Sequence, residues 1–146
     1  EIENKYREIF SAKIMFSERW AHRIEAGADI FCMPSRFEPC GLNQMYSMIY
    51  GTIPVVHRTG GLADTVIDPE ENEQSATGFS FDTFLKKDFV ETLKKALSLY
   101  NDQPKKWRIL QKNGMETDFS WKASAKKYLK IYKTMIKSTP REASAQ

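Results

Sequence analysis

The sequence is short of the residues that build metal sites. Its 146 residues include two cysteines, Cys32 and Cys40, and two histidines. No pair among these four residues has the spacing of zinc ligands. We therefore expect no structural metal, and the low cysteine content indicates a reducing compartment.

Long hydrophobic runs are absent as well. The longest stretch without Lys, Arg, Asp or Glu runs from Pro39 to His57, and it is interrupted by Asn43, Gln44 and Pro54. Such a stretch cannot span a membrane as a helix. The first residues show no basic start followed by an apolar run, so no signal peptide is recognised. These features predict a soluble protein.

The composition is that of an ordinary globular domain, with 41% hydrophobic and 28% charged residues. A chain of this length is one average domain and can bury a core. The net charge of +3 hides an uneven distribution, because residues 1–85 carry −6 and residues 86–137 carry +9. The last third therefore faces something acidic or anionic, or simply water.

Apolar spacing predicts alternating strands and helices. The run at 29–34 is nearly all apolar, as expected of a parallel strand buried on both faces. Gly27 is expected to cap the preceding helix, and an exposed acidic loop is expected over 68–77. Strands are expected at 13–16, 29–34, 53–56 and 78–81, and helices at 1–10, 18–26, 42–50, 87–100, 105–115 and 121–137. This order predicts an α/β fold with a parallel sheet, helices on both faces and a helical C-terminus.

Open parallel sheets bind ligands at the carboxyl ends of their strands, so the loop after 29–34 is the first candidate site. Here Glu38 precedes a helix N-terminus, whose backbone N–H groups suit hydroxyl and phosphate oxygens. Gly41 allows a close backbone approach. On residue type alone, Glu38 is more simply a partner of the helix dipole than a sugar ligand.

Three ordered motifs change this balance. Residues 34–46 read Pro-Ser-Arg-Phe-Glu-Pro-Cys-Gly-Leu-Asn-Gln-Met-Tyr, residues 50–56 read Tyr-Gly-Thr-Ile-Pro-Val-Val, and residues 59–66 read Thr-Gly-Gly-Leu-Ala-Asp-Thr-Val. They resemble the ADP-glucose-dependent starch synthases and bacterial glycogen synthases, as does Asp-Phe-Ser-Trp at 118–121. The resemblance covers nearly the whole chain before the last residues.

This resemblance implies a GT-B glycosyltransferase, a type with two Rossmann-like domains. The chain would be the later part of the C-terminal domain, beginning inside that domain. We expect residues 1–120 to form a donor-binding domain incomplete at its N-terminus, 121–137 a crossover-type helix, and 138–146 a disordered tail. If the crossover helix packs on the first domain, the isolated chain should be marginally stable.

The resemblance also implies roles for individual residues. Glu38 matches the catalytic-site acid that touches the donor glucose, and Phe16 matches an aromatic that stacks on adenine. Tyr46 stands where related glycosyltransferases have a second Glu, which favours the starch and glycogen branch. The remaining donor-binding residues would cradle the sugar and diphosphate or border their pocket: Cys40, Gly41, Leu42, Asn43, Thr59, Gly60 and Gly61.

The implied reaction is retaining transfer of glucose from ADP-glucose to the non-reducing 4-hydroxyl of an α-1,4-glucan, without a metal or cofactor. The implied partners are these two substrates and an N-terminal domain, with no nucleic acid and no membrane, in a bacterial cytoplasm or a plastid stroma. The family's diphosphate-binding Arg and Lys and its N-domain His lie upstream of the positions matched here. We therefore expect residues 1–146 alone to be inactive.

Two other functions remain open: a GT-B transferase that uses a UDP-sugar, and a non-catalytic module that binds nucleotide or glucan. Several residues also have simpler interpretations. Phe16 at a strand end is usually core, and Cys40 more simply makes a structural backbone contact than acts as a nucleophile. The lysines at 122, 126, 130, 133 and 137 form a stripe without interleaved aromatics, which is typical of a solvated helix face.

Overall fold

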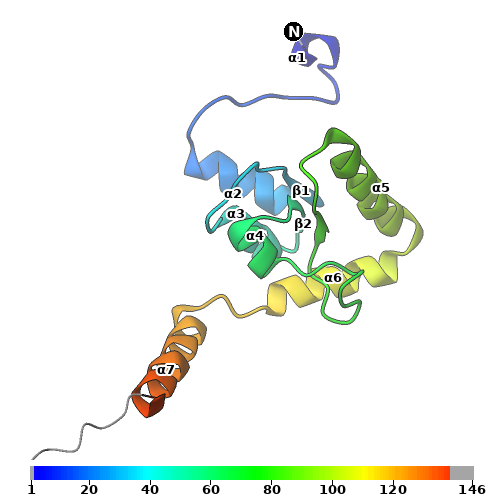
Figure 1. The fold of residues 1–146 in the computed structure, drawn as a ribbon. Coiled ribbons are helices and arrows are strands. Elements are labelled where there is room, and N and C mark those ends of the chain that lie inside the picture. Colours follow the sequence, from blue (N-terminus) through cyan, green and yellow to red (C-terminus); the bar gives the residue numbers. More distant parts are fainter. Residues whose placement is uncertain (1, 139–146) are drawn as a thin grey trace, which may run out of the picture.

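The computed structural model of the chain describes residues 2–138, which form a parallel sheet covered by helices (Figure 1). The strands are β1 (Ile30–Met33), β2 (Ile53–His57) and β3 (Phe79–Phe81). Their order is β1-β2-β3, and both pairings are parallel. The predicted α/β class with a parallel sheet is therefore confirmed.

From residue 18 onward, the predicted helices are present and lie close to their expected positions. α2 begins after Ser17, whose hydroxyl accepts a hydrogen bond from the backbone N–H of Trp20. α3 is capped at its C-terminal end by Gly51, which adopts the left-handed conformation that favours glycine. The bounds are α1 (Ile2–Lys5), α2 (Glu18–Gly27), α3 (Asn43–Tyr50), α4 (Gly60–Thr65), α5 (Lys86–Asp102), α6 (Pro104–Glu116) and α7 (Trp121–Ser138). Within residues 2–138, none of these helices has the length and apolar character needed to cross a membrane.

The core has two parts, one on each face of the sheet. Alternate residues of β2 point to opposite faces, so Val55 joins one cluster and Val56 the other. The first cluster lies under α5 and α6 and includes Phe79 and Trp107. The second lies under α3 and α4 and includes Met48. Helices cover both faces, as predicted.

The predictions for the first 16 residues are wrong. Residues 13–16 form no strand, and Ile14 is fully exposed. The helix predicted over 1–10 is reduced to α1, followed by a turn. Within the described residues no strand pairs with residues 13–16, and residues 2–11 are exposed. Neither a lone strand nor one helical turn is stable by itself.

Smaller differences from the prediction concern the burial of one strand and the ends of two helices. β1 is half-buried instead of buried on both faces, and Cys32 is exposed. Gly27 is the last residue of α2 and not its cap, which is the extended Ala28. Gly60 and Gly61 begin the short helix α4, which was not among the expected helices.

The acidic loop over 68–77 is exposed in its middle but anchored at its ends. Asp68 is buried and accepts hydrogen bonds from the backbone N–H groups of Glu70 and Ser80. Glu70 also pairs with Lys95 of α5, with 2.5 Å between the charged atoms. Part of the predicted charge asymmetry is therefore neutralised within the chain, because the acidic loop pairs with a basic helix.

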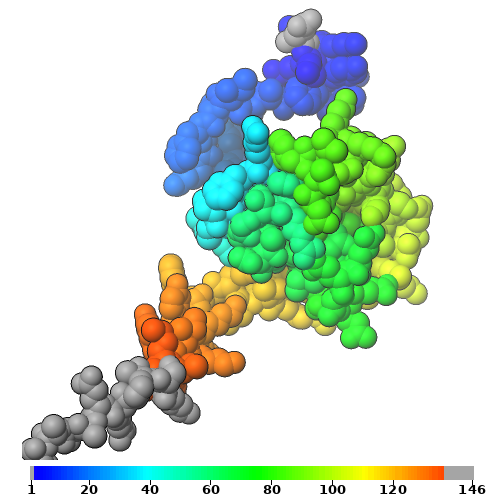
Figure 2. Space-filling model, viewed as in Figure 1, coloured from blue at the N-terminus to red at the C-terminus, as the bar shows by residue number. Residues whose placement is uncertain are grey.

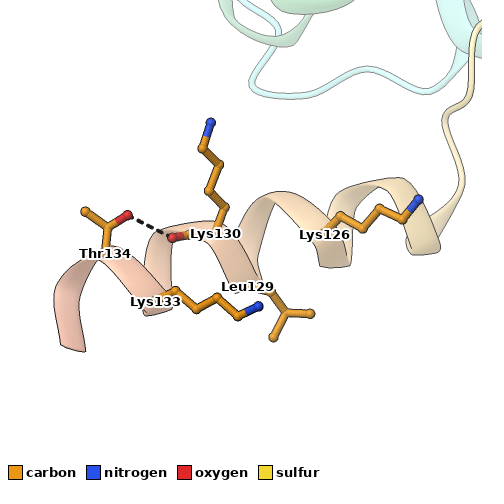
Figure 3. A pocket seen from close by; sticks show the side chains of 5 residues that line it. All are labelled: Lys126, Leu129, Lys130, Lys133 and Thr134. Carbon is orange, nitrogen blue, oxygen red and sulfur yellow. Dashed lines mark hydrogen bonds between the residues drawn. The ribbon is translucent and has the colours of Figure 1, made fainter. Parts of the chain in front are cut away.

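The last helix stands apart from the sheet. α7 projects from the body of the molecule (Figure 1), and the space-filling view shows it extending beyond α6 (Figure 2). The lysines at 122, 126, 127, 130 and 133 are exposed, and so are the large apolar residues, including Trp121 and Leu129. Figure 3 shows Lys126, Lys130 and Lys133 on this helix with Leu129 between them. The helix at 121–137 is confirmed, while the tail predicted from 138 falls, apart from Ser138, outside the described residues.

We expect backbone amides of α7 to exchange hydrogen quickly in this chain, because within residues 2–138 neither core cluster includes a residue of this helix. In a longer protein that supplies a docking domain, the same amides should exchange at least roughly tenfold more slowly. Hydrogen exchange on residues 121–136 in both proteins measures the difference. Equally strong protection in both would show that α7 docks within this chain, and the crossover assignment would be dropped.

Candidate functional site

The loops after β1 and β2 meet at the carboxyl end of the sheet. The backbone N–H of Gly61 donates to the carbonyl oxygen of Glu38 at 3.2 Å. A Cβ atom on Gly60 would fall on that same carbonyl, and one on Gly61 would fall on the carbonyl of Cys40. The residues at 59–61 therefore pack backbone against backbone on the loop that carries Glu38.

Gln44 organises this contact from the first turn of α3. Its side chain is fully buried, and its amide nitrogen lies 3.1 Å from the carbonyl oxygen of Cys40 and 3.0 Å from that of Gly41. The same nitrogen donates to the hydroxyl of Thr65, which donates to the carbonyl of Gly61. Sequence reasoning missed Gln44, although a glutamine on the buried side of a helix was a usable signal.

The N-terminus of α3 opens on this loop. Gly41 has a φ of 72°, a left-handed conformation that admits glycine readily. Leu42 is the N-cap residue, and its side chain makes no capping hydrogen bond. The backbone N–H groups of the first turn thus have no side-chain cap, and together with the helix dipole they suit an anionic or hydroxyl oxygen.

A cleft of about 500 Å³ adjoins this helix end, between residues 13–18, α2 and α3. Phe16 is 95% exposed, so it is not a core residue. Of the residues singled out from the sequence, the cleft brings together Phe16, Leu42, Asn43 and Tyr46. Its lining does not include Glu38, Cys40, Gly41, Thr59, Gly60 or Gly61, which lie in the adjoining loops.

Aromatic and acidic groups of α2 complete the cleft. The ring of His22 lies 5.5 Å from that of Tyr46, centroid to centroid, and its Nδ1 is 3.1 Å from the hydroxyl of Tyr50. Glu25 is buried, and one of its carboxyl oxygens has no hydrogen-bond partner among the residues that the structure describes. Burial raises the pKa of Glu25, and the charge of His22 opposes that rise. Glu25 had no role in the sequence prediction.

The chemistry available here is binding and charge stabilisation. Within residues 2–138, no three side chains among His, Cys, Asp and Glu gather closely enough to hold a metal ion. Arg58, the cation next to the turn at 59–61, pairs with Glu71 of the acidic loop. The site therefore offers an aromatic cleft, uncapped backbone N–H groups and the carboxylate of Glu38.

Comparison with known proteins identifies relatives of this chain. The chain is 52% identical over 135 residues to a glycogen synthase of Thioalkalivibrio sulfidiphilus and 49% identical over 139 residues to one of Hydrogenovibrio crunogenus, covering 90% and 93% of this chain. It spans about 28% of the length of each relative. The catalytic domain of starch synthase IV from Arabidopsis thaliana, solved with ADP and acarbose, superposes with a TM-score of 0.78 at 37% identity, over 91% of this chain and 28% of that one.

These similarities confirm the resemblance stated from the motifs and the partial GT-B fold. Residues 14–116 match the family described as glycosyl transferases group 1, and this segment includes β1–β3, the Glu38 loop and the cleft residues Phe16 and Tyr46. The chain belongs to the family of group 1 glycosyl transferases.

Proposed function

We propose that this chain is the donor-binding part of a synthase that transfers glucose from ADP-glucose to the non-reducing 4-hydroxyl of an α-1,4-glucan with retention. The observation that carries the proposal is the contact of the Glu38 loop with residues 59–61, beside the uncapped N-terminus of α3. The glycogen synthase relatives, and a similar starch synthase that was solved with ADP and acarbose, support it.

Each part of the site has a role in this proposal. Adenine occupies the cleft between Phe16 and Tyr46, where aromatic rings stack on the base. The diphosphate lies at the first turn of α3, whose N–H groups stabilise the charge that develops as the sugar leaves. Glu38 positions the donor glucose and acts on it electrostatically. No metal or cofactor enters the proposal.

The reaction needs groups that this chain does not supply. By resemblance, the cations that neutralise the diphosphate and the histidine near the reacting sugar lie in upstream segments. The chain spans about 28% of its glycogen synthase relatives, so the acceptor side would belong to another domain. We therefore propose that the 146 residues bind donor and that catalysis requires the N-terminal domain.

Donor choice tests this proposal. A full-length synthase that contains these residues should use ADP-glucose in preference to UDP-glucose, by at least roughly tenfold in kcat/KM. The reason is the Glu38–Asn43 loop combined with Tyr46 in place of a second acid. Both donors compete in a glucan-elongation assay with separately labelled sugars. Equal or better use of UDP-glucose would refute the branch assignment.

A further inference from the structure

His57, the last residue of β2, lies between the loops that leave the other two strands. Its imidazole is buried, with Nδ1 2.8 Å from the carbonyl oxygen of Ser35 and Nε2 3.3 Å from that of Asp82. The rings of Phe81 and Phe84 lie 5.4 Å and 5.2 Å from it, centroid to centroid. One side chain from the central strand thus reaches the exit loops of both neighbouring strands.

The two contacts are not equivalent. A neutral imidazole carries a single ring N–H, so it donates to one of the two carbonyl oxygens, and only an imidazolium donates to both. The carbonyl of Ser35 is the nearer acceptor. Ser35 also lies three residues before Glu38, which places the shorter contact in the loop of the proposed donor site.

The short segment from Ser35 to Glu38 is therefore held at both ends by residues that follow or end β2. His57 bonds the carbonyl of Ser35, and the backbone N–H of Gly61 bonds the carbonyl of Glu38. With both carbonyls bonded, the backbone that carries the Glu38 side chain has little freedom to shift. Without the first bond, the one described hydrogen bond that remains between residues 35–38 and the residues at or after the end of β2 is that of Gly61 to Glu38.

We propose that His57 is a positioning residue: by donating to the carbonyl of Ser35 it sets the place of the Glu38 loop. The importance of that loop for catalysis rests on the proposed function above. The positioning itself is a property of this chain and needs no ligand. His57 acts through the backbone of the loop and touches no substrate.

Three substitutions separate hydrogen bonding from packing. In His57→Asn the amide nitrogen falls near the position of Nδ1, so the bond to Ser35 is retained. In His57→Gln it falls near the position of Nε2, so the bond to Asp82 is retained instead. His57→Phe keeps a ring against Phe81 and Phe84 but loses both donors.

Hydrogen exchange at two amides provides the test in the 146-residue chain. The amide of Gly61 reports on the Glu38 carbonyl, and the amide of Arg58, which donates to Phe81 at 2.9 Å, is the internal control. In His57→Gln and His57→Phe we expect Gly61 to exchange at least about fivefold faster, the factor that matches one net hydrogen bond. Arg58 should stay unchanged, and His57→Asn should restore the slow exchange of Gly61.

Unchanged Gly61 exchange in His57→Gln would overturn the proposal. So would equal acceleration at Gly61 and Arg58, or equal loss in His57→Asn and His57→Gln, because both results indicate general packing. If His57→Phe does not fold, the Asn and Gln pair still decides. The readout requires no nucleotide, so failure of the donor assignment and failure of this inference are observed separately.

Discussion

Replacing Glu38 with Gln in a full-length synthase that contains these residues is expected to lower kcat by about a hundredfold or more, with the fold intact. Removing one preorganised electrostatic group from an active site typically has an effect of this size. The loop is held through the backbone carbonyl of Glu38, not through its carboxylate, so the substitution leaves the contact with Gly61 in place.

An exposed glutamate provides the matched control for this substitution. Glu91 of α5 loses the same charge in Glu91→Gln, and its weak pair with Lys87 lies on the surface. Turnover should be unchanged in that variant, while urea midpoints should be similar in both. A normal rate for correctly folded Glu38→Gln would return Glu38 to the role of a helix-dipole partner.

Replacing Gly61 with Ala is expected to lower the free energy of unfolding of the chain by about 3 kcal/mol. The new Cβ would meet the carbonyl oxygen, carbonyl carbon and Cα of Cys40, which are backbone atoms that cannot rotate away. The two loops must then separate, and the hydrogen bond from Gly61 to Glu38 is lost with them. Urea denaturation measures the change.

Gly27→Ala is the matched control, because a Cβ there meets nothing within 4 Å and Gly27 is the last residue of α2. The same added methyl group should leave stability unchanged or raise it by roughly 0.5 kcal/mol through reduced backbone entropy. If Gly61→Ala proves as stable as Gly27→Ala, the close backbone packing at residues 59–61 does not restrict the side chain at position 61, and the prediction is wrong.

The sequence predicted the three strands of the sheet and most of the helices that pack on them, and also α7, whose large apolar residues are exposed. β2 is apolar because helices cover both of its faces, and α6 shows a clear apolar side because Trp107 and Leu110 are buried. The prediction of a strand at 13–16 was wrong because apolar residues alone do not make a strand. A strand also needs a neighbouring strand that takes up its backbone hydrogen bonds. Local pattern does not report whether that neighbour is present.

The residues of the candidate site could be predicted from the sequence where they belong to a motif. The motifs identified Glu38 and Gly61, and Phe16 came from the resemblance, but their spatial relation required the fold. The backbone contacts of Gln44 and His57 were not predicted, because the carbonyls they bond are distant in sequence or lie within a turn. Hydrogen bonds to backbone leave no pattern of residue types, so only the geometry reveals them.

Titration of the 146-residue chain with ADP, followed through backbone amide resonances, tests the central claim most directly. Binding should be saturable with a Kd of roughly 1 mM, and the shifts should concentrate at Phe16 and residues 41–46. UDP should bind more weakly, and Phe16→Ala should weaken ADP binding. A second pocket lies between the loop at 68–77 and helices α5 and α6. Absence of saturable shifts, or shifts confined to that second pocket, would contradict the assignment of this chain as a donor-binding domain.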